Sequence, residues 1–175
     1  MSMFNGTRVQ LVGGPVTLVT ATFTRPADTT AYASGDLIAN STTAGSVTVM
    51  SFTGVALEGG GTGMIRRVRI RKSGTSTTSA SFRVHLYNAL PTVSNGDNSA
   101  WLTDQSAAYM GAFDVTLDRA FTDGAAGNGV PLIGSELNFD LPGSSTTVYG
   151  LLEARAAYTP ASGESFTVEL EVLQN

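Results

Sequence analysis

Hydrophobic and polar residues alternate with a period of two along much of the chain. In the segments 82–87, 113–118, 137–141 and 166–173 every second residue is apolar. This period is typical of β-strands that turn one face to a core and the other to water. It predicts strands over residues 81–88, 112–118, 136–141 and 164–173, and further strands are predicted over residues 16–24, 46–53, 64–72 and 147–156.

The spacing of these segments predicts an all-β fold. About eight strands, separated by turns rich in Gly, Asn, Asp, Ser and Pro, favour a two-sheet β-sandwich, and an eight-stranded jelly roll is its most economical version. An eight-stranded barrel is the alternative. The 175 residues are expected to form one β-sandwich domain, with residues 1–15 as a short N-terminal arm. The remaining long segments, 25–45, 89–111 and 119–134, are predicted to be connections, and only 101–110 has room for a helical turn or two.

Composition narrows the classes of function. The chain has no cysteine and one histidine, so it cannot form a disulfide, a thiolate nucleophile or a two-histidine zinc site. Charged residues make up 14% and the net charge is -4, which argues against a nucleic-acid binder. Apolar stretches are too short for a membrane helix, and the segment 9–23 is too interrupted for a cleaved signal peptide. We expect no enzymatic activity, no cofactor, no metal and no small-molecule substrate.

The residues whose types can carry chemistry all have plainer structural interpretations. No Gly-x-Ser-x-Gly motif occurs, and the glycine-rich segment 59–63 lacks the Lys-Ser/Thr of a phosphate loop. His85 is predicted to lie mid-strand, opposite Phe82 and Val84, as a surface or interface histidine. The carboxylate pairs Glu169/Glu171 and Asp114/Asp118 are interpreted as polar strand faces. The loop oxygens at 95–98 with Asp104, and at Asp123 with Asn128, lack EF-hand spacing, so cation binding there stays open.

Charge is distributed unevenly along the chain. Residues 1–87 hold eight Lys/Arg and three Asp/Glu, a net of +5, whereas residues 88–175 hold two and eleven, a net of -9. In the segment 65–72, Arg67, Arg69 and Arg71 alternate with Val68 and Ile70, so one strand face presents a row of guanidinium groups. This row is either a docking strip for an acidic protein surface or for phosphates, a cross-strand partner of the Glu169/Glu171 face, or protection for an edge strand.

Several stretches resemble the jelly-roll capsid decoration (cement) proteins of tailed bacteriophages. They are residues 29–38 (TTAYASGDLI), a strand that opens with 64–66 (MIR) after a glycine-rich turn, 82–88 (FRVHLYN) followed by Pro91, and 149–155 (YGLLEAR) followed by 157–159 (AYT). With the first and last predicted strands included, the resemblance extends over residues 16 to 173. The arginine-rich segment 66–71 departs from the expected pattern.

The resemblance implies a structural virion protein, assembled in the host cytoplasm, that binds the capsid exterior and bridges subunits of the major capsid protein. It also implies a homotrimer, without nucleic acid or membrane as partner. The candidate interface residues are Arg66, Arg67, Arg69, Arg71, Lys72, Tyr32, Asp36 and Trp101. A head-fibre or tail component is one alternative. Another is a jelly-roll carbohydrate-binding module that uses Trp101, Tyr109 and the Asp/Asn loops, although Trp101 is more simply expected to pack under its own loop.

Overall fold

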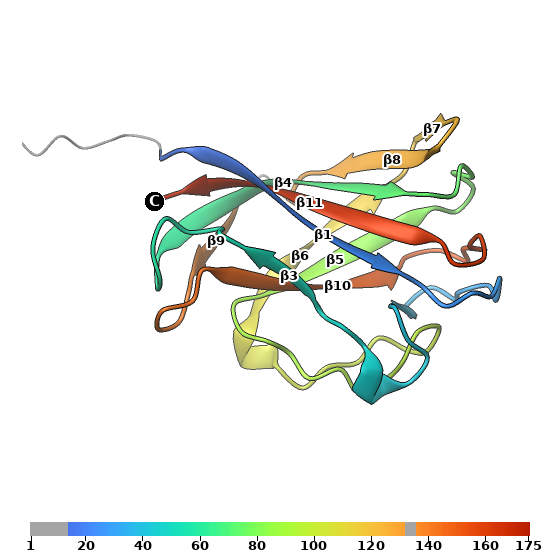
Figure 1. The fold of residues 1–175 in the computed structure, drawn as a ribbon, viewed down its shortest axis with the longest axis horizontal. Coiled ribbons are helices and arrows are strands. Elements are labelled where there is room, and N and C mark those ends of the chain that lie inside the picture. The colour runs from blue at the N-terminus through green and yellow to red at the C-terminus, as the bar shows by residue number, and fades with distance from the viewer. Residues whose placement is uncertain (1–13, 132–135) are drawn as a thin grey trace, which may run out of the picture.

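Two antiparallel sheets face each other across the main hydrophobic core (Figure 1). The structure is a computed structural model that describes residues 14–131 and 136–175. The six-stranded sheet has the order β1 (Val16–Thr24), β11 (Ser165–Gln174), β4 (Thr62–Lys72), β8 (Gly124–Gly129) and β7 (Arg119–Phe121), and β9 (Leu137–Asp140) also pairs with β4. The five-stranded sheet has the order β2 (Leu37–Ile38), β10 (Thr147–Ala154), β5 (Ser81–Tyr87) and β6 (Tyr109–Thr116), and β3 (Met50–Thr53) also pairs with β10.

The strand pairing is that of a jelly roll. The first strand pairs with the last, β1 with β11, and the next pairs lie inside it: β2 and β3 with β10, β4 with β8, and β5 with β6. This nesting is what results when one long antiparallel hairpin is rolled into two sheets. Each sheet ends in strands that have a neighbour on one side only, so the predicted sandwich is confirmed and the alternative barrel is wrong.

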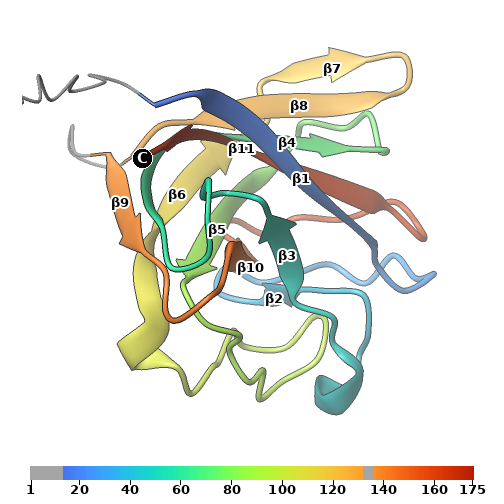
Figure 2. The same ribbon diagram turned by 60° about the vertical axis from the view of Figure 1, so that its left-hand side comes forward.

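All eight predicted strands are present, but three further strands were not predicted. The strand predicted over residues 46–53 is shorter than expected. The 3-10 helix η1 (Ala44–Ser46) precedes it, and strand pairing starts only at Met50. β2, β7 and β8 lie inside segments that were predicted to be connections. Figure 2 shows β7 and β8 as a hairpin that extends the six-stranded sheet beyond β4.

β8 was missed because its sequence, GAAGNG, has no alternating large apolar side chains. Its small residues instead allow the two sheets to approach each other closely. A Cβ atom on Gly127 would lie 2.2 Å from the carbonyl oxygen of Thr116, and one on Gly129 would lie 2.5 Å from that of Asp114, both on β6. The sequence signal for this strand is therefore its glycine content rather than an alternation of hydrophobic residues.

The outer face of the five-stranded sheet is covered, contrary to the expectation that outer strand faces meet water. Leu37, Tyr87, Ala108 and Leu151 form a second buried hydrophobic cluster there, with partly buried side chains from the segments 47–49 and 89–101 against it. The long connections after β2 and after β5, the latter including η2 (Ser106–Ala108), run beneath this sheet in Figure 1. The predicted helical turn is therefore η2.

The described residues 14–131 and 136–175 contain no helix that is long and apolar enough to cross a membrane. Most of the predicted N-terminal arm, residues 1–13, lies outside the described residues. The remaining part joins the sheet, because the amide of Gln174 donates to the carbonyl oxygen of Pro15 at 3.0 Å.

Candidate functional site

The arginine row lies on the outer face of the six-stranded sheet, and two of its members are paired across strands. Arg67 faces Glu171 and Arg69 faces Glu169 in the β4–β11 register. The guanidinium nitrogens lie 2.7 Å and 2.8 Å from the respective carboxylate oxygens. A bulge in this register lies next to Arg67, and as a result the side chains of Arg66 and Arg67 are both exposed. The cross-strand interpretation of the strip is therefore correct for Arg67 and Arg69.

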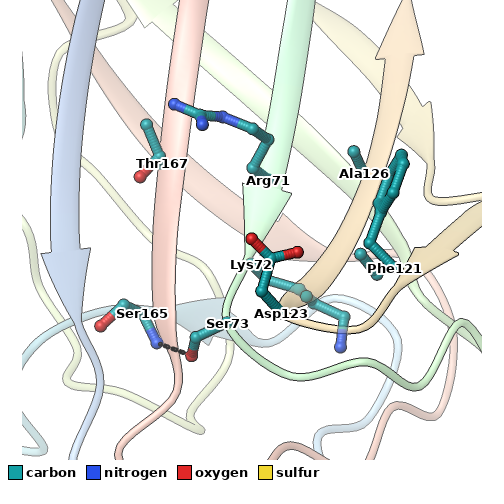
Figure 3. Close-up of a pocket in the computed structure, with 10 residues that line it drawn as sticks. Arg71, Lys72, Ser73, Phe121, Asp123, Ala126, Ser165 and Thr167 are labelled. Atoms are coloured by element: carbon teal, nitrogen blue, oxygen red, sulfur yellow. Dashed lines mark hydrogen bonds between the residues drawn. The ribbon is translucent and has the colours of Figure 1, made fainter.

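Arg71 differs from these two arginines because Thr167, rather than a glutamate, stands opposite it. No carboxylate in the described residues lies within ion-pair distance of Arg71, and its side chain is exposed. It lines a shallow depression of about 240 Å³ together with Phe121, Asp123 and Thr167. Figure 3 shows Arg71 and Thr167 on neighbouring strands, with Phe121 on the opposite side of Arg71 from Thr167. This depression is the part of the strip that offers an unpaired cation beside an exposed aromatic ring.

Lys72 does not belong to the strip. Its side chain points to the inside of the sandwich and is fully buried, with its Nζ 2.9 Å from Oε1 of Glu164. The other oxygen of Glu164 accepts a hydrogen bond from the hydroxyl of Tyr158. The inclusion of Lys72 among the interface candidates was wrong, because the strand period of two places it on the face opposite Arg71.

Tyr32 is likewise buried, so its inclusion among the interface candidates was wrong. Its hydroxyl donates to Asp97 at 2.7 Å and accepts from Nε of Arg25, also at 2.7 Å. Burial is the main reason that the pKa of Tyr32 is raised above its usual value, so the phenol stays protonated. Asp97 also pairs with Arg25 and accepts the amide of Ala39. Both carboxylate oxygens of Asp97 are therefore engaged in contacts that hold its own loop.

Asp36 is half-buried and closes a turn of its own segment. Its carboxylate accepts the amide of Ala33 at 2.7 Å, and its carbonyl oxygen accepts the amide of Ala154 at 2.8 Å. Gly35, before it, has a φ of +98°, a value that L side chains rarely adopt. The contacts of Asp36 explain a structural role, and an interface role for it stays a prediction.

A second candidate site lies on the outer face of the five-stranded sheet. A pocket of about 320 Å³ opens there, between β5, the start of β6 and the connection that joins them. Its lining residues are His85, Tyr87, Trp101, Leu102, Thr103, Ser106 and Tyr109. The imidazole of His85 stacks on the indole of Trp101, with ring centroids 4.0 Å apart. The ring of Tyr109 meets Tyr87 edge to face at 5.4 Å. Trp101 is half-buried against His85, so the expectation that it packs under its loop is correct.

His85 is 6% exposed, so the interpretation of a surface histidine was wrong. Its Nε2 lies 2.6 Å from Oε2 of Glu153, and its Nδ1 lies 3.2 Å from the hydroxyl of Tyr109. Burial lowers the pKa of His85, although Glu153 opposes this shift. Sequence reasoning missed Glu153 as a partner because the two residues are 68 positions apart.

The series Tyr109, His85 and Glu153 has the order of an activated hydroxyl, a base and an orienting carboxylate, but its surroundings do not favour catalysis. Burial raises the pKa of the Tyr109 phenol, which keeps it protonated rather than nucleophilic. Trp101 covers one face of the imidazole. Glu153 is also held by Arg155 at 3.0 Å. The series is therefore better suited to holding the wall of the pocket in place.

Three of the segments that carry the resemblance meet in space, whereas the segment 64–66 lies on β4 of the other sheet. The amide of Tyr32 donates to Tyr158, and the amide of Gly35 donates to Ala154, both at 2.8 Å. Leu37 pairs with Glu153 in the β2–β10 register, and His85 pairs with Leu151 in the β10–β5 register. Residues 29–38, 82–88 and 149–159 thus form one structural unit, although they are far apart in the sequence.

No protein-family model and no curated protein matches the chain. Among solved structures, a chain of the full particle of Israeli acute paralysis virus, heated to 63 degrees, covers 99% of this chain and 74% of its own length, at 10% identity and a TM-score of 0.29. A chain of Desmodium yellow mottle tymovirus covers 93% of this chain and 89% of its own length, at 9% identity and a TM-score of 0.25. TM-scores this low carry no structural or functional weight.

Proposed function

We propose that this protein is a structural component of a virion, which decorates and stabilises the exterior of a tailed-phage capsid by bridging subunits of the major capsid protein, without catalysis. The observation that supports this proposal is the structural unit of residues 29–38, 82–88 and 149–159. These segments carry β2, β5 and β10, which are neighbouring strands of the five-stranded sheet. The resemblance to the decoration proteins is therefore concentrated in one contiguous part of the fold.

The depression at Arg71, on the outer face of the six-stranded sheet, is the surface that we assign to capsid docking. Of the three arginines in the row, Arg67 and Arg69 are paired with the glutamates of β11, whereas Arg71 has no ion-pair partner in the described residues and lies beside the exposed ring of Phe121. Arginine and aromatic residues are enriched at protein interfaces, whereas lysine is depleted. The only lysine of the chain is buried. An acidic side chain of the capsid protein would complete the ladder at the position where Thr167 replaces a glutamate.

The test is co-sedimentation of the purified protein with heads of the virus whose genome encodes it. The Arg71→Glu variant should reduce the bound fraction strongly while the domain remains folded. The matched control is Arg66→Glu, which makes the same change of charge on the same strand at an exposed position outside the depression. Equal binding by both variants and the parent would refute the docking surface, and failure of the parent to bind heads would refute the decoration function. Binding to tails alone would assign the protein to the tail.

Light scattering on a sizing column tests the assembly that the resemblance implies. A homotrimer should have about three times the mass of 18.1 kDa, either free or after release from heads. A monomer under both conditions would remove the trimer from the proposal.

A further inference from the structure

The pocket at Trp101 is separate from the docking surface, because it lies on the other sheet and on the opposite side of the sandwich. We infer that it is a binding site for a neutral saccharide, with the aromatic rings as the stacking surface and the hydroxyl groups as hydrogen-bond partners. This inference does not depend on the proposed capsid role.

The chemistry of the lining selects a neutral ligand. None of the seven residues that line the pocket is Asp, Glu, Lys or Arg. The carboxylate that His85 contacts, that of Glu153, is buried and shared with Arg155. A charged ligand would lose its hydration in this pocket without gaining an opposite charge.

The lining also combines the two features that a sugar ring requires. A pyranose has a face of C–H groups, which contacts aromatic rings, and a rim of hydroxyl groups, which needs donors and acceptors. Tyr109 is 41% exposed and Leu102 is 54% exposed, so the apolar surface is accessible from solvent. The hydroxyls of Thr103, Ser106 and Tyr109 stand around it. The volume of about 320 Å³ is at the small end of the range for ligand sites, which suits one sugar ring.

The pocket is held in a defined shape without a ligand. The hydroxyl of Tyr87 lies 3.1 Å from that of Thr103, and Tyr109 is held by His85 at 3.2 Å. The stack of Trp101 on His85 and the pair of His85 with Glu153 connect this wall to β10. A preformed site of this kind binds at a low cost in conformational entropy.

The only tryptophan of the chain is the one in this pocket, so its fluorescence reports on the site directly. The experiment titrates the whole protein with neutral gluco-, manno-, galacto- and N-acetylglucosamine oligosaccharides up to millimolar concentration and follows tryptophan emission. The inference predicts a saturable change with at least one of these sugars, and little dependence of the affinity on salt. Tyr109→Ala should weaken this binding about tenfold or more, whereas Tyr109→Phe, which keeps the ring, should retain most of it.

Phe121→Ala is the matched control, because it removes an exposed aromatic ring from the other sheet and should leave sugar binding unchanged. Leu102→Ala is a second pocket variant at an exposed position and should weaken binding without unfolding the domain. Absence of a saturable response to all four sugar classes would overturn the inference. A change of Trp101 emission on addition of heads, but not of sugars, would overturn the inference as well. That result would indicate that the pocket binds a side chain of the capsid protein.

Discussion

The ion pair of Lys72 and Glu164 gives the clearest measurable consequence of this fold. Both side chains are 0% exposed, and Nζ of Lys72 lies 2.9 Å from Oε1 of Glu164. Nζ also donates to the carbonyl oxygen of Gly74 at 3.0 Å and lies 5.1 Å from the ring centroid of Tyr158. The change Glu164→Gln keeps the volume of the side chain and an acceptor for Tyr158, but it removes the carboxylate that neutralises the buried ammonium group.

The expected cost is large because a buried charge is left without its counter-ion. Removing one member of a buried ion pair typically costs about 3–5 kcal/mol of the free energy of unfolding. At roughly 2–4 °C per kcal/mol for a domain of this size, the melting temperature should fall by about 6–20 °C. The matched control is Glu171→Gln, which removes a carboxylate from the pair with Arg67, whose side chain is 44% exposed. That variant should lose at most about 1 kcal/mol.

Urea unfolding followed by circular dichroism measures both variants against the parent protein. The double variant Lys72→Met/Glu164→Gln tests the cause, since it removes both charges and should be more stable than Glu164→Gln alone. A free energy of unfolding for Glu164→Gln that matches Glu171→Gln would refute the reasoning. So would a double variant that is less stable than the single one by the full cost of the lysine substitution.

Two further predictions concern β8 and His85. Gly127→Ala should cost roughly 1–3 kcal/mol, because its Cβ would lie 2.2 Å from a backbone oxygen, whereas Gly45→Ala, with no atom within 4 Å, should be nearly neutral in urea unfolding. Because burial lowers the pKa of His85 from 6.5, the unfolded chain takes up a proton there first as the pH falls. Stability should therefore decrease below about pH 6.5, and His85→Gln should flatten this decrease in thermal scans between about pH 7.5 and 5.5. Equal slopes for both proteins would contradict the assignment.

Local sequence patterns predicted the eight main strands because burial on one face of a strand requires an apolar residue at every second position. The pattern failed at β8, where the two sheets approach so closely that only small residues fit at Gly127 and Gly129. It also failed on the outer face of β5, where Tyr87 and His85 are covered by a long connection rather than by water. In both places the environment of the residue comes from segments that are distant in sequence.

For the candidate sites, too, the sequence indicated which way a side chain points but not which residues it contacts. The alternation at 67–71 established that three arginines share one strand face, and it could equally have established that Lys72 faces the other way. Whether each arginine is paired depended on the register of β4 against β11, which sets residues about 100 positions away beside them. For this reason Arg71, and not Arg67 or Arg69, is the member of the row without a carboxylate partner in the described residues. The aromatic pocket depended on tertiary structure still more, since Trp101 reaches His85 only through the path of its loop.

The sequence by itself determined the all-β class, the inner and outer faces of most strands and the arginine row, because these follow from a side-chain period of two within each segment. Only the tertiary structure decided the jelly-roll pairing, the neutralisation of Arg67 and Arg69, the burial of Tyr32, and the convergence of Trp101, Tyr109 and His85 on one pocket. The physical reason is that the period of a strand specifies which way a side chain points. Its neighbour across the sheet is specified by long-range register and loop path, which the packing of the whole domain selects.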